Sequence, residues 1–155
     1  MLSFFSWNGR IGRLRYLAWR AWMVSLYLLI SFPILLLASG LSVLASLGGE
    51  SFSFSPVFLG LTIQIIVFSY FAVVVDVKRL HDLNKSSWWV VLTFVPIANI
   101  LLITYLLFSS GSDDHNDYGA SPPENSVGVH ILAWIPLAIV LIGILIIILY
   151  NTGLY

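Results

Sequence analysis

Long apolar stretches separated by short polar ones are the main pattern in this sequence. Four of them are long enough to cross a bilayer as helices, at residues 22–47, 56–77, 87–108 and 131–150. At about 1.5 Å of rise per residue, about 20 residues reach roughly 30 Å, the thickness of the hydrocarbon core. Backbone amides in lipid have to be satisfied within their own segment, which favours helices over strands. The pattern therefore predicts an all-α, polytopic membrane protein, a four-helix transmembrane bundle that forms one domain over residues 1–155.

The composition supports this class of protein. Hydrophobic residues make up 59% of the chain and charged residues 9%, against about 45–50% and about 25% in soluble domains. The chain has no cysteine, which excludes disulfides, thiolate metal sites and cysteine nucleophiles. Seven basic and seven acidic side chains cancel, which argues against a nucleic-acid partner.

The basic residues predict the orientation of the spans. Four lie before the first span and three between the second and the third: Arg10, Arg13, Arg15, Arg20, Lys78, Arg79 and Lys85. Because an even number of spans separates the two groups, both can face the cytoplasm, as the positive-inside rule requires. We therefore expect both termini in the cytoplasm and the loops of residues 48–55 and 109–130 outside.

The third span is the least regular of the four. Pro96 and Asn99 lie near the middle of its apolar run. Proline removes a helix hydrogen bond, and asparagine needs a partner in lipid. A re-entrant segment is the alternative, but its limbs would hold only about eleven residues, about 16 Å each. We favour a full span.

Aromatic residues alternate with arginines in residues 4–20, just before the first span. Aromatic rings settle at headgroup depth and guanidinium groups bind phosphates, so the pattern is typical of an interfacial amphipathic segment. Gly9 and Gly12 flank Arg10 and leave room for a turn that aims Arg10 and Arg13 at a specific group. The expected partner of this segment is the lipid bilayer, through its anionic headgroups.

The connector between the second and third spans carries the motif Arg79-Leu80-His81-Asp82. Asp76, at the edge of the second span, needs a partner, for which Arg79 is the nearest candidate and the N-terminal arginines are alternatives. His81 beside Asp82 could serve in acid/base chemistry or in headgroup binding. A single His–Asp pair is weak evidence for catalysis, so we predict no catalytic residue and lean against an enzyme.

The loop after the third span is rich in oxygen ligands, with Asp113, Asp114 and Asp117 around His115. When the loop is aligned with an EF-hand that begins at Asp114, tyrosine and asparagine occupy two of the ligand positions, so the calcium pattern fails. We predict a solvated loop, with no metal and no cofactor.

Taken together, the motifs resemble a known family. Residues Trp7-Asn8-Gly9-Arg10-Ile11-Gly12-Arg13, Arg79-Leu80-His81-Asp82, Ser87-Trp88-Trp89 and Asn116-Asp117-Tyr118-Gly119 follow one another as in the domain of unknown function 805, over about residues 3–123. The resemblance implies a small bacterial inner-membrane protein without an assigned reaction. Arginine is common in the family where this chain has Asp117, and the fourth span lies beyond the shared region.

These motifs define the candidate binding residues: Arg10, Arg13, Asp76, Arg79, His81, Asp82, Asn116 and Tyr118. We expect a non-enzymatic protein that binds anionic headgroups or a partner protein through a cytoplasmic basic face. The alternative is a small oligomeric transporter or channel, suggested by Asp76, Gln64 and Asn99 within otherwise apolar spans. If the three motifs form one site they must share a face, and that requires the re-entrant third segment.

Overall fold

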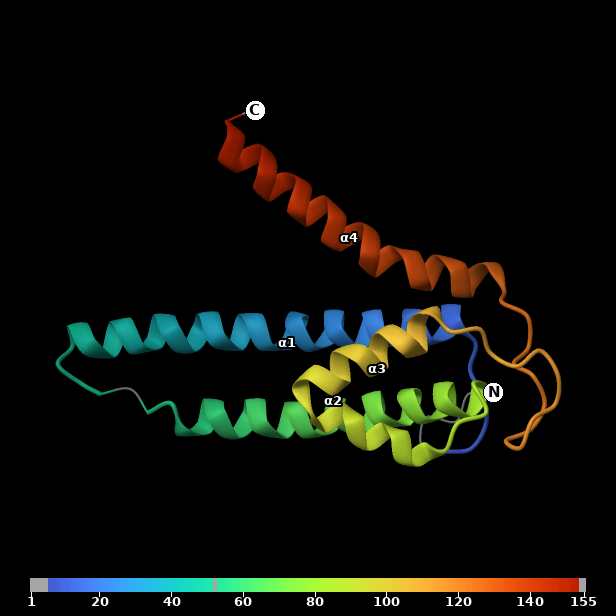
Figure 1. Ribbon diagram of the computed structural model, residues 1–155. Helices are drawn as coiled ribbons and strands as arrows, with labels where there is room; N and C mark the ends of the chain where they lie inside the picture. Colours follow the sequence, from blue (N-terminus) through green and yellow to red (C-terminus); the bar gives the residue numbers. More distant parts are fainter. Residues whose placement is uncertain (1–5, 52, 154–155) are drawn as a thin grey trace. The chain divides into compact units, whose positions relative to one another are not determined.

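Helices make up most of the protein in the computed structural model, which describes residues 6–51 and 53–153 (Figure 1). Their order is α1 (Arg13–Leu47), α2 (Ser55–Asp82), the 3₁₀-helix η1 (Ser87–Phe94), α3 (Pro96–Phe108) and α4 (Val127–Thr152). By length and composition, α1, α2 and α4 are each able to cross a membrane. The all-α class with long apolar helices is therefore confirmed. Phe4 and Phe5 of the expected interfacial segment lie outside the described residues.

The chain divides into two compact units, one of residues 6–22 and 73–153 and the other of residues 23–72. In the second unit, the amide of Gln64 on α2 donates to the Tyr27 carbonyl of α1 at 2.9 Å and to the Ser31 hydroxyl at 3.1 Å. Tyr27 also lies edge-on to Phe68, with ring centroids 5.7 Å apart. The polar side chain at position 64 is thus satisfied by the neighbouring helix, as lipid surroundings demand.

In the first unit, the N-terminal segment and the start of α1 pack on the end of α2. Residues 13–20, expected as part of an interfacial segment, form the first two turns of α1, so no helix boundary falls at residue 20. The Ile11 amide donates to the Lys78 carbonyl at 3.3 Å, and Ile11 and Tyr16 are fully buried. The core of this unit lies here, because every residue of α2 from 73 to 82 is buried.

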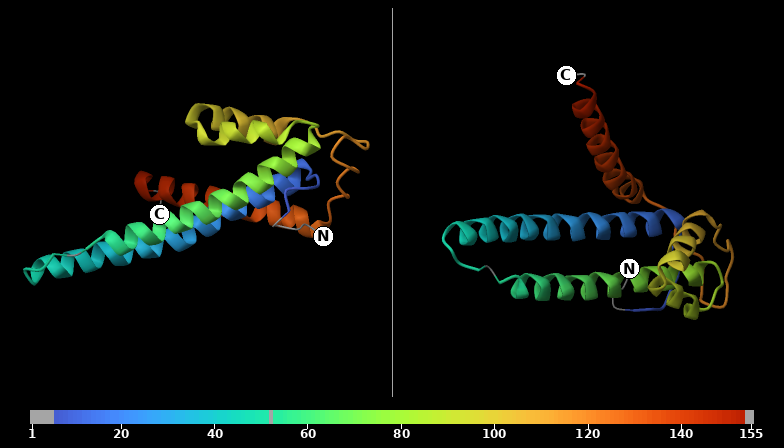
Figure 2. Two further views of the ribbon diagram at one scale, coloured as in Figure 1. Left: turned by 90° about the horizontal axis from the view of Figure 1, so that it is seen from below. Right: turned by 60° about the vertical axis from the view of Figure 1, so that its left-hand side comes forward.

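Residues 87–108, expected as one span, form two short helices that fold back on each other (Figures 1 and 2). Between them Val95 is extended, with φ −107° and ψ 114°, and Pro96 opens α3. Proline has no N–H, disfavours a helical conformation in the residue before it, and is well suited to the first turn of a helix. Three helices of membrane length are therefore present among the described residues, and the predicted count of four is not confirmed.

Candidate functional site

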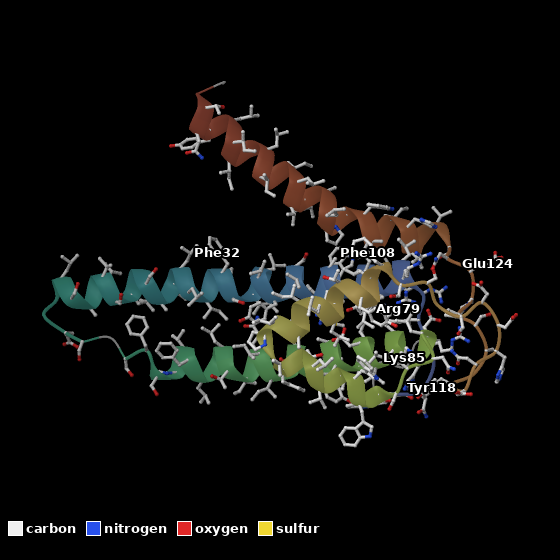
Figure 3. All side chains as sticks on the ribbon, in the orientation of Figure 1. Phe32, Arg79, Lys85, Phe108, Tyr118 and Glu124 are labelled. Atoms are coloured by element: carbon white, nitrogen blue, oxygen red, sulfur yellow. The ribbon has the colours of Figure 1, made fainter. Side chains whose placement is uncertain are left out.

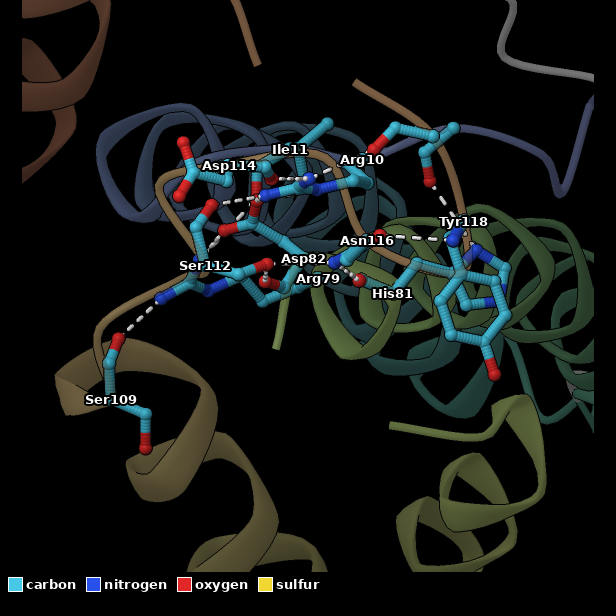
Figure 4. Close-up of polar contacts among 12 residues, drawn as sticks. Arg10, Ile11, Arg79, His81, Asp82, Ser109, Ser112, Asp114, Asn116 and Tyr118 are labelled. Carbon is cyan, nitrogen blue, oxygen red and sulfur yellow. Dashed lines mark hydrogen bonds and ion pairs between the residues drawn. The ribbon is translucent and has the colours of Figure 1, made fainter. Parts of the chain in front are cut away.

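Two arginines share one buried carboxylate at the end of α2 (Figure 4). Nε and Nη2 of Arg10 each lie 3.2 Å from Oδ1 of Asp82, and Nη1 of Arg79 donates to Oδ2. The exposed fractions of the three side chains are 1%, 0% and 3% for Arg10, Arg79 and Asp82. We call these three residues the arginine–aspartate hub. It joins the N-terminal segment to the last turn of α2.

Backbone carbonyls accept the remaining hydrogen bonds of Arg10. Its Nη1 donates to the carbonyls of Asp114, at 2.8 Å, and Gly119, at 3.0 Å, and its Nη2 also donates to the Ser112 carbonyl. Together with the bonds to Asp82, these use all five N–H donors of a guanidinium. Arg10 therefore has no donor left for a headgroup, and it holds the loop after α3 instead.

Arg79 fixes the end of α3 in the same way. Its Nε donates to the Leu106 carbonyl at 2.8 Å and its Nη2 to the Ser109 carbonyl at 2.5 Å. Carbonyls at the C-terminus of a helix lack partners within the helix and carry partial negative charge. Arg79 supplies both the missing donors and a compensating positive charge. The hub holds two positive charges against one negative charge, so these carbonyl dipoles help to stabilise the excess.

His81 lies beside the hub, and both of its ring nitrogens and one face of its ring contact other residues. Its Nδ1 lies 3.3 Å from the Gly9 carbonyl, which can only accept, and its Nε2 lies 2.7 Å from the Ser87 hydroxyl. The Tyr118 ring stacks on the imidazole, with centroids 3.9 Å apart and planes 6° from parallel. In the neutral ring, Nδ1 therefore carries the proton and Nε2 accepts from Ser87.

Asn116 connects this histidine to the loop. Its amide donates to the His81 carbonyl at 2.9 Å and to the Ser112 hydroxyl at 2.7 Å, while its side-chain oxygen accepts from the Tyr118 amide at 2.9 Å. The Asn116–Gly119 bridge closes the turn below Tyr118. The loop of residues 109–119 is thus built onto the end of α2, and polar atoms gather there around Arg79 and Tyr118 (Figure 3).

Asp76 forms a second buried group six residues before Asp82, about 1.7 helical turns away. The Tyr16 hydroxyl donates to its Oδ1 at 2.9 Å, and Nη1 of Arg20 lies 3.8 Å from its Oδ2. The predicted pairing with Arg79 is wrong, because Arg79 turns toward Asp82 and the carbonyls of α3. The N-terminal arginines, named as alternatives, supply the partner through Arg20.

Gly111 is a residue of the site that the sequence analysis missed. A Cβ at this position would overlap the Asp82 carboxylate and approach its Cγ to 2.8 Å. The loop backbone therefore lies directly against the hub, where only glycine fits. The Ser-Gly-Ser run at residues 110–112 was visible in the sequence, but nothing there indicated which side chain would cover it.

The predicted site residues fall into three places. Six lie together at the end of α2: Arg10, Arg79, His81, Asp82, Asn116 and Tyr118. Asp76 belongs to the neighbouring group, and Arg13 is exposed on the first turn of α1. Within residues 6–51 and 53–153, no three histidine or carboxylate side chains gather as metal ligands. The contacts at the end of α2 join segments that are distant in the sequence.

Three apolar helices of membrane length, with a buried polar group at the end of α2, define an α-helical membrane protein. Residues 4–120 match the family described as protein of unknown function (DUF805), and the chain belongs to that family. The resemblance seen in the motifs is thereby confirmed. The match contains the hub and residues 109–120 of the loop after α3, whereas α4 lies beyond it.

Two relatives from Escherichia coli strain K12 match shorter stretches. Inner membrane protein YhaH is 33% identical over 48 residues, which cover 31% of this chain and 40% of YhaH. Inner membrane protein YhaI is 34% identical over 50 residues, or 32% of this chain and 42% of YhaI. The chain thus spans about two fifths of the length of the curated relatives it matches. No solved structure matches it.

Proposed function

We propose that this protein binds anionic lipid headgroups through cations that the hub leaves exposed. Arg13 and Lys85 are exposed, and neither contacts an acidic side chain among the described residues. Trp88 and Trp89, which follow Lys85 closely in the chain, are 81% and 51% exposed. Indoles settle at headgroup depth, where cations meet phosphates. This combination of exposed cations and indoles at the polar end of α2 carries the proposal.

The proposal assigns different roles to the basic residues than the sequence alone suggested. Arg10 and Arg79 are positioning residues, because their guanidinium groups are buried and bound to Asp82 and to carbonyls. Arg13 and Lys85 bind lipid. Part-exposed Arg20 contributes from its place beside Asp76.

Location and orientation are part of the same proposal. YhaH and YhaI carry the name inner membrane protein, and we extend that location to this chain. All seven basic residues lie in the first unit, on the N-terminal segment, the first turns of α1 and the end of α2 and its connector. The positive-inside rule then directs the N-terminus and the connector to the cytoplasm.

Lipid retention measured by native mass spectrometry tests the proposal. The purified protein is released from micelles that contain phosphatidylglycerol or phosphatidylcholine, and bound lipids are counted. Each cation near an anionic surface contributes about 1 kcal/mol. Arg13→Gln with Lys85→Gln should therefore weaken phosphatidylglycerol binding by about 2 kcal/mol, roughly 30-fold, and leave phosphatidylcholine unchanged.

A double variant of opposite charge is the matched control. Asp113 and Asp117 are exposed in the loop after α3, so Asp113→Asn with Asp117→Asn should not lower phosphatidylglycerol retention. Equal retention by the wild type and by Arg13→Gln/Lys85→Gln would refute headgroup binding. If that variant instead loses a co-purifying protein, or a second copy of the chain, the surface serves a protein partner.

The transporter alternative draws no support from the polar residues that suggested it. Gln64 is bound to α1, and Asp76 is bound to Tyr16 and paired with Arg20. Oδ2 of Asp76 and the side-chain oxygen of Asn99 are buried without a hydrogen-bond partner, and two such atoms are too few to line a path. Ion or solute flux in proteoliposomes that Asp76→Ala abolishes would restore the alternative.

A further inference from the structure

Both ends of residues 87–108 are attached to the same end of α2. At the beginning, the Ser87 hydroxyl lies 2.7 Å from His81 Nε2. At the end, Arg79 binds the Ser109 carbonyl at 2.5 Å, and the Ser112 amide donates to the Asp82 carbonyl at 2.9 Å. A segment whose two ends meet one helix terminus enters and leaves on the same side.

The two arms are also too short to cross a bilayer. η1 has 8 residues and α3 has 13, which gives about 16 Å and about 20 Å at 2.0 and 1.5 Å of rise per residue. The hydrocarbon core measures about 30 Å, so one leaflet takes up about half of that.

The surface of the hairpin indicates what surrounds it. Val90, Leu102 and Leu106 are buried on its inner side, whereas Phe94 is 70% exposed and Ile97 77% exposed at the bend. An apolar surface of this kind is unfavourable in water and matches acyl chains. The indoles where η1 begins suit the headgroup layer above them.

α4 starts beside the first turns of α1, within the first unit. Trp22 of α1 donates its indole N–H to the Leu132 carbonyl at 2.8 Å, and Arg15 donates to the Glu124 carbonyl at 2.9 Å. The 26 residues of α4 extend about 39 Å from there. This length is enough to reach the other side of the membrane.

We propose that residues 87–108, joined to the end of α2 at both Ser87 and Ser109, insert as a hairpin into one leaflet only. The loop of residues 109–126 then lies on the side of the connector, α4 is the third crossing, and its C-terminus lies on the opposite side. The hairpin is an interaction surface for the acyl chains of that leaflet. The inference is independent of headgroup binding, because it depends on chain direction and not on charge.

Single cysteines test the topology without background labelling, because the chain has none of its own. They are placed at Asp113 and Thr152, with Lys85 and Ser51 as references for the two sides; all four positions are exposed. A membrane-impermeant maleimide is applied to right-side-out and to inverted membrane vesicles. We expect Asp113→Cys to label with Lys85→Cys, and Thr152→Cys to label with Ser51→Cys.

Two results would overturn the proposal. If Asp113→Cys labels with Ser51→Cys, residues 87–108 cross the membrane. If Thr152→Cys labels with Lys85→Cys, α4 does not cross. Ile97→Cys at the bend adds a test of depth: it should resist the maleimide in both kinds of vesicle and react after detergent is added. Labelling of Ile97→Cys in intact vesicles would place the hairpin in water and refute insertion.

Discussion

Replacing Asp82 by asparagine removes the negative charge of the hub and leaves a side chain of nearly the same size. The carboxylate accepts from Arg10 at two nitrogens and from Arg79 at one. In Asp82→Asn both guanidinium groups remain buried without a counter-charge, and the new amide N–H₂ faces groups that can only donate. Breaking a buried ion pair from one side costs about 3–5 kcal/mol. We expect a loss of this size, because both cations remain almost fully buried.

Thermal unfolding in detergent micelles measures this effect. For chains of about 150 residues, 1 kcal/mol corresponds to roughly 2–4 °C in Tm, so Asp82→Asn should lower Tm by about 6–20 °C. Asp113→Asn is the matched control, since Asp113 is exposed in the loop beside the hub and a surface change of this kind alters stability by about 0.5 kcal/mol or less. A shift for Asp82→Asn no larger than that of Asp113→Asn would refute the buried hub.

Two smaller changes test the contacts around the hub. Gly111→Ala places a Cβ against the Asp82 carboxylate and should lower Tm in the same assay. Gly143→Ala is the control, because no atom lies within 4 Å of a Cβ built at that position, and its Tm should not fall. Equal Tm values for the two variants would contradict the close approach of Gly111 to Asp82. Tyr16→Phe removes the hydroxyl bonded to Asp76 and should cost about 1.5–3 kcal/mol, the range for hydrogen bonds to charged groups. Tyr105→Phe on exposed Tyr105 is its control, and a similar loss there would refute a specific role for Tyr16.

The sequence predicted the membrane class because span-length apolar runs can be recognised from the local hydrophobicity of the chain, without knowledge of tertiary contacts. It also predicted that Asp76 needs a cation, since a carboxylate inside an apolar segment requires one. It could not predict which cation, because Arg79 is nearer in the chain while Arg20 is nearer in the fold. That choice depends on Arg79 binding the carbonyls of α3, and backbone carbonyls have no sequence signature.

In the third segment the sequence marked the break correctly, whereas the predicted full span is not confirmed. Pro96 marked the break, and the structure has its bend at Val95 and Pro96. Limbs of about eleven residues, about 16 Å each, favoured a full span over a hairpin at the level of sequence. A limb of about 16–20 Å cannot cross, but it is long enough to enter one leaflet and return. The length therefore argues against a crossing and not against the hairpin.

The side of the membrane on which the loop after α3 lies determines the net charge of the basic face, the side that carries the seven basic residues. With four spans, the seven basic residues would share their side with Asp76 and Asp82 only, for a net charge of +5. With the hairpin, the four acidic residues of the loop join them and the net charge falls to +1. A face of net charge +1 exerts little long-range attraction on an anionic membrane. Headgroup binding must then come from local contacts at Arg13 and Lys85.

This difference gives the acidic double variant a second use. If the loop shares the basic face, Asp113→Asn with Asp117→Asn raises the net charge of that face from +1 to +3, and phosphatidylglycerol retention should increase. If the loop lies on the other side, the same variant leaves that face unchanged and retention stays at the wild-type value. Unchanged retention together with a large loss in Arg13→Gln/Lys85→Gln would therefore support headgroup binding and contradict the hairpin, so the two proposals can fail separately.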